Sequence, residues 1–494
     1  MLKSRYAFPL ALVLVLVALA GGIRLFVSSG PKLREWRPDN KAYERDKKLV
    51  TGAIGRAPRI WEPSRKPDVV LIVLDTTRLD RLGVYGYDKE TTPRLDKWAA
   101  NARIYDNARA DGPWTLPSHA SLFTGKWPIA HGAHGVPLAV AQQGAPLKRG
   151  SATVARAMRQ AGYRTVGIAA NKAFLDKSMG LDQGFDVWLC GQVSNGSDGT
   201  VDPTADRVQR MAQTALAQPR DASLFLFLNF MDPHTPWHVR AGYVREPDKI
   251  RKNTLPGGNA WQRASDRLLV NQEANPETIA SWSEAYDAEI RFMDEHLGAL
   301  LEALPSLGID EDDFVFIVSD HGEYLGEHHL VQHSRDVYET VNRVPLLIRG
   351  PGYSPGRDAT PLQHHDLAGM ILAAAGLPAL PDAASTATSG IQVTESYYAR
   401  KTELVNPKLA ASFDRVRRAF VQAPHALILG SDGSSEGYDL ETDPGQESPL
   451  ATAPWLEDLK GAAAAWQASQ VEAATAQTDE PVNTEALRAL GYIQ

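Results

Sequence analysis

Acidic and imidazole side chains follow three apolar runs of this 494-residue sequence. Asp75 closes DVVLIVLD, Asp232 and His234 follow SLFLFLNF, and Asp320 and His321 follow DFVFIV. A single Asp after a strand commonly serves as a helix cap or a turn residue. Three runs ending in this way favour a shared site instead. Asp75, Asp320 and His321 together offer ligands that suit a divalent cation.

A compact run of hydroxyl groups, PWTLPSHASLFTG at 113–125, could supply a nucleophile. Pro113 and Trp114 predict a turn and the following residues predict a helix, so Thr115 or Ser118 would lie near a helix N-terminus that favours anions. A hydroxyl at that position often does no more than cap the helix. Beside a bound cation, however, the pKa of the Thr115 hydroxyl would fall and an alkoxide would become available near neutral pH.

The apolar runs predict the framework that holds these groups. They are solid rather than alternating, which indicates strands buried on both faces, and RVPLLIRGPG at 343–352 is a fourth run. Helical stretches such as 151–163 and 281–304 lie between the runs. The predicted fold is therefore α/β, with a doubly wound, mainly parallel sheet, and such sheets bind ligands beyond the carboxyl ends of their strands.

Composition narrows the classes of partner. The formal net charge is -7 and no long basic run occurs, so nothing favours a nucleic-acid-binding protein. Cys190 is the single cysteine, which excludes a disulfide within the chain and a cysteine-based metal site.

The N-terminus has the layout of a targeting segment. Lys3 and Arg5 precede the apolar run AFPLALVLVLVALA. We interpret residues 1–29 as a signal peptide or an N-terminal membrane anchor, with membrane anchoring through residues 7–29 in the second case. Residues 30–66 are polar and contain several prolines, which predicts a linker. The folded part of the chain is accordingly expected outside the cytoplasm, in the periplasm or the extracellular space.

Several segments in a fixed order resemble the sulfatase family of the alkaline phosphatase superfamily. They include LIVLDTTRLDRLGVYGY, PWTLPSHASLFTG, FMDPHTPW, VSDHGEYLGEHHLVQHS and YDLETDPGQESPLA. The resemblance implies an α/β catalytic domain over 67–390. A smaller C-terminal subdomain with a short antiparallel sheet, followed by a tail, would occupy 391–494.

The resemblance also assigns a nucleophile and a metal site. The family nucleophile opens a Cys/Ser-x-Pro-Ser-Arg motif, which corresponds here to 115–119. Thr115 would therefore be the nucleophile, and it would act as a plain alcohol because threonine is not matured to formylglycine. The family's metal ligands map onto Asp75, Asp320 and His321, with Thr115 completing the set. Carboxylate and imidazole ligands together do not choose among Ca²⁺, Mg²⁺, Mn²⁺ and Zn²⁺.

Other family positions differ in this sequence. His119 replaces the motif arginine and would orient or deprotonate Thr115. His234 corresponds to an anion-binding histidine and His333 falls near a family lysine, so both would hold ester oxygens or protonate the leaving group. Thr76 replaces the second acid that often follows the first, and AANKAFL stands where the family has Gly-Lys-Trp-His-Leu.

The chemistry of the expected nucleophile, Thr115, affects which class of ester the protein could hydrolyse. A formylglycine hydrate expels sulfate through its second hydroxyl, which Thr115 lacks, whereas a phosphothreonine can be resolved by water or an acceptor alcohol. We expect an exported, metal-dependent hydrolase of sulfuric or phosphoric esters, with phosphate mono- or diesters favoured and a small-molecule, glycan or lipid ester as substrate. The alternative is a catalytically inactive binding protein with the same fold.

A serine hydrolase is a further alternative. GSSEG at 433–437 matches the nucleophile-elbow pattern around Ser435, but that elbow requires a helix after the serine. The sequence that follows, YDLETDPG, favours a turn.

Overall fold

The computed structural model describes residues 40–56, 66–135, 145–190, 205–397 and 406–476, apart from 220–221, 236, 238, 241, 245–246, 249, 251–258, 272 and 274. The expected signal peptide or anchor over residues 1–29 lies outside the described residues. Within the described ranges, no helix has both the length and the apolar content that crossing a membrane requires.

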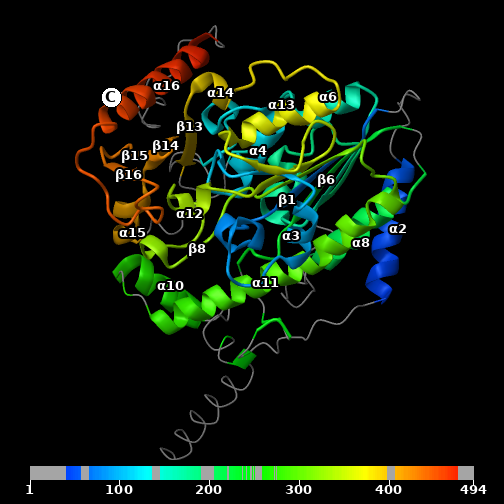
Figure 1. Cartoon of the computed structure of the whole chain (residues 1–494), viewed down its shortest axis with the longest axis horizontal. Coiled ribbons are helices and arrows are strands. Elements are labelled where there is room, and N and C mark those ends of the chain that lie inside the picture. The colour runs from blue at the N-terminus through cyan, green and yellow to red at the C-terminus, as the bar shows by residue number, and fades with distance from the viewer. Residues whose placement is uncertain are drawn as a thin grey trace, which may run out of the picture. The chain divides into compact units, whose positions relative to one another are not determined.

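An eight-stranded sheet forms the centre of the structure (Figure 1). Its strands, in spatial order, are β11 (Gly356–Asp358), β2 (Arg103–Tyr105), β10 (Leu346–Arg349), β7 (Phe314–Val318), β1 (Val69–Leu74), β6 (Leu224–Phe230), β4 (Arg164–Ala169) and β5 (Val187–Cys190). The five strands from β7 to β5 run parallel, whereas β10 is antiparallel to both of its neighbours. The prediction of a mainly parallel, doubly wound sheet is confirmed.

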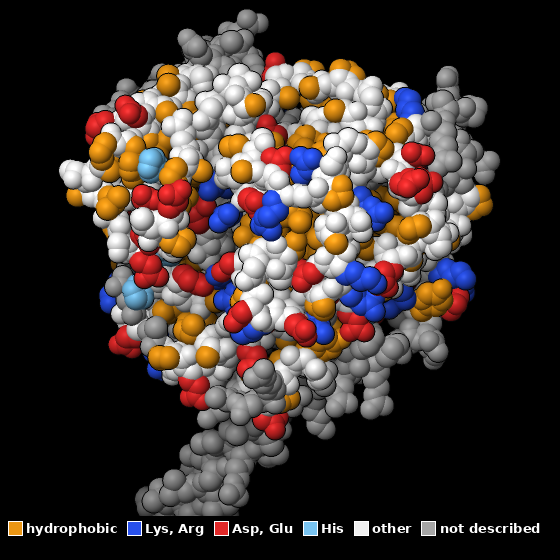
Figure 2. Space-filling model, viewed as in Figure 1, with side chains coloured by type: hydrophobic (Ala, Val, Ile, Leu, Met, Phe, Trp, Pro, Cys, Tyr) orange, Lys and Arg blue, Asp and Glu red, His pale blue; other side chains and the backbone are white. Residues whose placement is uncertain are grey.

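Helices cover both faces of this sheet (Figure 1). Alternate residues of β1 illustrate why: Val70, Ile72 and Leu74 belong to one apolar core, and the residues between them belong to the other. The first core is completed by α3 (Pro93–Ala99), α8 (Ala205–Leu216) and α11 (Pro276–Ala303), and the second by α4 (Thr115–Thr124), α6 (Val154–Gln160) and α13 (His364–Ala374). On the face shown in Figure 2, acidic, basic and apolar side chains are interspersed over the surface.

A four-stranded antiparallel sheet lies in the C-terminal part of the chain, as the sequence predicted. It consists of β13 (Gln392–Tyr397), β14 (Val416–Gln422), β15 (His425–Gly430) and β16 (Ser435–Asp439), in that order. Helix α16 (Leu456–Ala476) packs on it through Leu459 and Trp466, which contact the core around Phe420 and Leu427. The domain boundary at 390/391 stays a prediction.

Shorter elements connect these parts. They are β3 (Ala108–Arg109), α5 (Pro128–His131), α7 (Lys172–Leu175), α10 (Asn259–Asn271), β8 (Tyr324–Leu325), β9 (Val331–Gln332), α12 (Glu339–Asn342), β12 (Leu362–Gln363), α14 (Thr386–Ser389) and α15 (Pro407–Phe413).

The expected linker over residues 30–66 needs correction, because part of it is helical. Residues 40–56 form helix α2 (Asn40–Arg56), which packs against α8. Val50 and Ile54 lie four residues apart, on one side of the helix, and both are buried. Arg207 of α8 donates two hydrogen bonds to Asp46, at 2.7 and 3.1 Å. These buried positions stand among many charged residues, and the apolar period was too weak to predict this helix.

A buried acid-histidine pair fixes the segment that leads into α4. Asp111 accepts hydrogen bonds from the backbone N–H of His365 at 2.9 Å and from its Nδ1 at 2.7 Å. The carbonyl of Asp111 accepts from the N–H of Glu395, on β13. The residues before Thr115 are thus tied to α13 and to the small sheet. Burial raises the pKa of Asp111, and the pKa of His365 is raised by the Asp111 carboxylate even though burial opposes that shift.

We expect Asp111→Ala to lower the free energy of unfolding by about 3–5 kcal/mol near pH 6, because it removes one partner of a buried charged pair. Both pKa values are raised by folding, so the pair's contribution is present at low pH and is lost as the pH rises through the folded-state values. The gap between wild type and variant should therefore narrow towards pH 9, as measured by urea unfolding. Asp111→Asn keeps an acceptor for Nδ1 and should lose less stability; a gap that stays constant with pH would contradict this account.

Candidate active site

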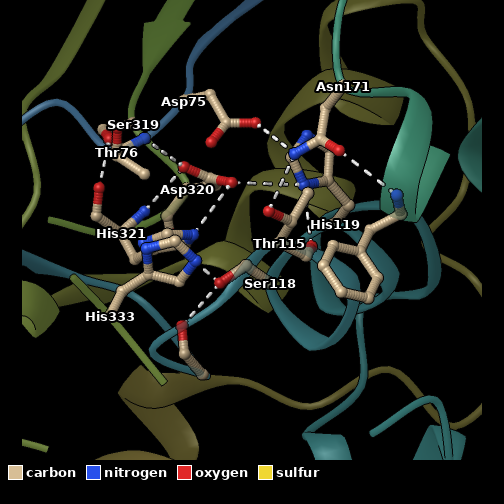
Figure 3. Close-up of polar contacts among 12 residues, drawn as sticks. Asp75, Thr76, Thr115, Ser118, His119, Asn171, Ser319, Asp320, His321 and His333 are labelled. Atoms are coloured by element: carbon tan, nitrogen blue, oxygen red, sulfur yellow. Dashed lines mark hydrogen bonds and ion pairs between the residues drawn. The ribbon is translucent and has the colours of Figure 1, made fainter. Parts of the chain in front are cut away.

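The four residues expected around a cation come together at one edge of the large sheet (Figure 3). Asp75 directly follows β1, and Asp320 and His321 follow the neighbouring parallel strand β7 after Ser319. Thr115 is the first residue of α4. Ligand atoms of Asp75, Asp320 and His321 lie within 4.8 Å of one another, and all four side chains are fully buried.

Each of the three candidate ligand residues is held through one side-chain atom and has another side-chain atom without a hydrogen-bond partner. Asp320 Oδ1 accepts from the N–H groups of Thr76 and His321, at 3.0 and 2.9 Å. His321 Nδ1 lies 2.9 Å from the carbonyl of Gly322. Within the described residues, Asp75 Oδ1, Asp320 Oδ2 and His321 Nε2 are buried and have no hydrogen-bond partner.

Unpartnered buried polar atoms cost free energy, and here they belong to three side chains that converge on one place. The set is two carboxylate oxygens and one imidazole nitrogen, whose other atoms are held by backbone groups or amides. These residues fit a divalent cation. Burial and the nearby Asp75 carboxylate raise the pKa of Asp320, while burial lowers the pKa of His321 to about 4, which leaves the imidazole neutral, as a metal ligand must be.

Asn171 holds the candidate nucleophile. Its Nδ2 donates to Thr115 Oγ1 at 3.1 Å and to Asp75 Oδ2 at 2.9 Å (Figure 3). Its backbone N–H donates to the side-chain oxygen of Asn229, whose own Nδ2 donates to Asp75 Oδ2 at 3.2 Å. The sequence did not single out either asparagine. The available signal was that Asn171 comes two residues after the end of β4, just as the acids follow their strands.

His119 lies beside Thr115 but is turned to its backbone. His119 Nδ1 is 2.9 Å from the Thr115 carbonyl oxygen, one helical turn earlier, and 3.6 Å from Asp320 Oδ2. The ring is buried between Phe123 and Phe227, with centroids 6.3 and 5.8 Å away. The contact is therefore with the carbonyl rather than with the hydroxyl that His119 was expected to orient.

The two remaining histidines lie next to the ligand set. The ring centroid of His333 is 4.9 Å from that of His234 and 4.5 Å from that of His321. His333 Nδ1 lies 3.1 Å from Glu323 Oε1, a carboxylate to which the sequence analysis assigned no role. Gln332 and Ser334, on either side of His333, both have left-handed backbone angles, with φ of 64° and 70°. Strain of this kind is typical of functional sites.

The serine-hydrolase alternative is not supported. Ser435 is exposed and begins β16, after a turn that joins it to β15. A hairpin strand, not a helix, follows the glycine-serine turn, so the nucleophile elbow is absent there.

A change at Asp320 tests the metal site apart from activity. Asp320→Asn keeps the shape but removes one of two buried, mutually repelling carboxylates. In EDTA we expect the variant to melt at a higher temperature than wild type, since functional charge clusters are held at the expense of stability. Adding a divalent cation should stabilise wild type, by about 2.7 kcal/mol at a hundred times the Kd, and should not stabilise the variant.

The exposed Asp312→Asn is the matched control for this thermal-unfolding experiment and should keep the wild-type response to the cation. An equal response of Asp320→Asn and wild type would show that the cation binds elsewhere.

Known proteins share this sequence pattern and this fold. The sulfatase family model matches residues 67–377. An ulvan-active sulfatase of Formosa agariphila is 26% identical over 431 residues, which cover 81% of this chain and 80% of that protein. A Delta 4,5-hexuronate-2-O-sulfatase of Bacteroides thetaiotaomicron is 22% identical over 440 residues, covering 80% and 86%.

Solved structures agree in fold. A protein solved in complex with its substrate D-glucosamine-2-N,6-O-disulfate superposes with a TM-score of 0.65 at 19% identity, over 84% of this chain and all of that one. A phosphonate monoester hydrolase of Agrobacterium radiobacter gives 0.61 at 17% identity, over 82% and 96%. At these identities the structures support the fold alone. The family match covers more than half of the chain, and on that basis the chain belongs to the sulfatase family and is a sulfatase-family hydrolase.

Proposed function

We propose that this chain is an exported, metal-dependent hydrolase that cleaves phosphate mono- or diesters through a covalent intermediate on Thr115. The observation that carries the proposal is the position of the Thr115 hydroxyl. It lies at the N-terminus of α4, receives a hydrogen bond from Asn171, and shares that donor with Asp75 of the ligand set.

The type of nucleophile favours phosphorus over sulfur. A sulfated threonine is an alkyl sulfate with no second hydroxyl to expel the sulfate, so the enzyme would be trapped after one turnover. A phosphorylated threonine can be attacked at phosphorus by water, which restores the hydroxyl. A sulfuric ester therefore remains the second candidate, supported by the names of the relatives.

The steps follow from the residues around Thr115. Its Oγ1, which has released its proton to water, attacks phosphorus as the bond to the leaving oxygen breaks, and His333 gives that oxygen a proton. Glu323 holds Nδ1 of His333, which stabilises the protonated ring. Water then attacks the phosphothreonine from the opposite side, its proton passes to His333, and Thr115 leaves as the alkoxide with which the cycle began.

Two groups stabilise charge during these steps. Asn171 Nδ2 donates to Oγ1 and so favours its anionic form. The N-terminus of α4 favours negative charge on the transferred group. A divalent cation held by Asp75, Asp320, His321 and Thr115 would polarise the ester and supply positive charge; Ca²⁺, Mg²⁺, Mn²⁺ and Zn²⁺ remain candidates.

The proposal also includes where the enzyme acts and which kind of molecule bears the ester. The basic flank and apolar run of residues 1–29 support export to the periplasm or the extracellular space, as a cleaved or anchored protein. The relatives are named for ulvan and for hexuronate, which supports a glycan among the small-molecule, glycan and lipid esters that the site could take.

The hydroxyl of Thr115 can be removed without changing the shape of the side chain. We expect Thr115→Val to lower kcat/KM for phosphate esters by at least about 10³-fold, whereas Thr115→Ser, which keeps the hydroxyl, should retain most activity. The assay compares nitrophenyl sulfate, a nitrophenyl phosphate monoester and a diester, with the full chain and each divalent cation in turn.

The stereochemistry at phosphorus gives an independent check of the same step. Two displacements, first by Thr115 and then by water, predict net retention of configuration with a chiral thiophosphate ester. Inversion would mean direct attack by water, and aryl sulfate turnover that survives in Thr115→Val would rule out the threonine mechanism. If no ester is hydrolysed and no cation is bound, the result would favour the catalytically inactive binding protein.

A change at His333 tests the proposed proton donor. His333→Ala should lower kcat/KM for an alkyl phosphate ester by about 10²–10⁴-fold, and much less for a nitrophenyl ester, whose leaving oxygen needs no proton. His425→Ala, a half-buried histidine of β15 that stacks on Trp455, is the matched control and should leave both rates unchanged. Equal losses on the two esters would remove His333 from the role of acid.

A further inference from the structure

The site gathers negative charge and little positive charge of its own. Two buried carboxylates, Asp75 and Asp320, stand against one expected divalent cation. Across the part of the chain that the structure describes, no lysine or arginine forms an ion pair or a hydrogen bond with Asp75, Asp320 or Thr115. The strand ends that could have carried cations carry the neutral amides Asn171 and Asn229 instead.

The arginine near Asp75 in the sequence is already neutralised. Arg78 is buried and pairs with Asp80 at 2.7 Å and with Glu327 at 2.6 Å. Its Nη1 also donates to the carbonyl of Glu323. This guanidinium adds no net charge to the site.

Three further cations near the site are engaged or turned outwards. The buried Arg335 donates to the carbonyl of Val331 and to the side-chain oxygen of Gln332. Arg240, which contacts Asp232 at 2.9 Å in the segment that carries His234, pairs with Glu289 at 2.6 Å. Lys172 follows Asn171 in the sequence but is exposed. With a divalent cation in place, the charges of the two carboxylates and of the cation balance, and His333 Nδ1 lies 3.1 Å from the carboxylate of Glu323.

Because the site is buried, its charge balance determines whether it accepts a singly or a doubly charged ester. A phosphate monoester carries close to two negative charges at neutral pH, because its second pKa is about 6. A diester carries one. An additional buried charge with no partner is expensive, since charges interact much more strongly away from water. The fully buried site therefore penalises the second charge of a monoester.

We infer that this site selects a singly charged ester, a phosphodiester, over a phosphate monoester, and that the neutral amide of Asn171 sets this preference. The inference rests on the proposed function and names its substrate class. Asn171 is the residue that decides, because its Nδ2 already contacts the nucleophile and a carboxylate ligand, so a cation at this position would add charge where the ester is attacked.

The first experiment uses wild-type protein and two substrates with one leaving group, methyl nitrophenyl phosphate and nitrophenyl phosphate. Near pH 8 we expect kcat/KM for the diester to exceed that for the monoester by at least about tenfold. As the pH falls below the second pKa of the monoester, the ratio of monoester to diester should rise, and the enzyme's own ionisations cancel in that ratio. A monoester preference at pH 8, or a ratio that is constant with pH, would overturn the inference.

A charge change provides the second measurement. Asn171→Lys should raise the monoester-to-diester ratio at pH 8, whereas Lys172→Ala should leave it unchanged. A change of that ratio in Lys172→Ala would mean that the exposed lysine serves the site, and would overturn the charge count. If Asn171→Lys does not fold, the wild-type ratio and its dependence on pH still decide.

The experiments distinguish a failure of the phosphodiester preference from a failure of the proposed function. A preference for the monoester leaves phosphoryl transfer to Thr115 intact and overturns only the argument from charge. Hydrolysis of aryl sulfate alone, with neither phosphorus ester turned over, overturns the proposed function and with it the phosphodiester.

Discussion

Repulsion between two buried carboxylates is the constraint around which this structure is arranged. Asp75 and Asp320 end adjacent parallel strands, and their ligand atoms lie within 4.8 Å of each other and of His321. Parallel strands bring their carboxyl ends to one edge, so the fold itself enforces this approach. Amide and backbone donors hold one oxygen of each carboxylate, and a divalent cation would hold the other.

Backbone strain accompanies that arrangement. Thr76 is β-branched and fully buried, yet it has a φ of 56°. Its N–H is one of the two backbone groups that donate a hydrogen bond to Asp320 Oδ1. Its carbonyl accepts from the Tyr286 hydroxyl at 2.6 Å, so α11 helps to keep the strained turn in place. Gln332 and Ser334 show the same left-handed geometry around His333. Strained backbone therefore lies both beside the candidate cation ligands and beside His333.

Much of the site could be predicted because strand ends and helix starts have clear sequence signals. Solid apolar runs located Asp75, Asp320 and His321, and the turn before α4 located Thr115. Asn171 and Glu323 were harder to recognise, since their roles depend on which side chains the folded sheet brings near them. The orientation of His119 depends on one turn of helix geometry, which no residue type reveals. Helix α2 has only a weak apolar period and is defined by its contacts with α8.

Helix α4 has a consequence for how such a site can change over evolution. All ten of its residues, from Thr115 to Thr124, are buried, so Thr115, the proposed nucleophile, lies on an element with no surface of its own. Substitutions along it would disturb packing on every side, whereas the first residue can exchange one hydroxyl or thiol for another with little change in volume. New substrates are then more readily acquired through surface segments around the strand ends, while the chemistry changes through a single residue at the start of a helix that otherwise stays the same.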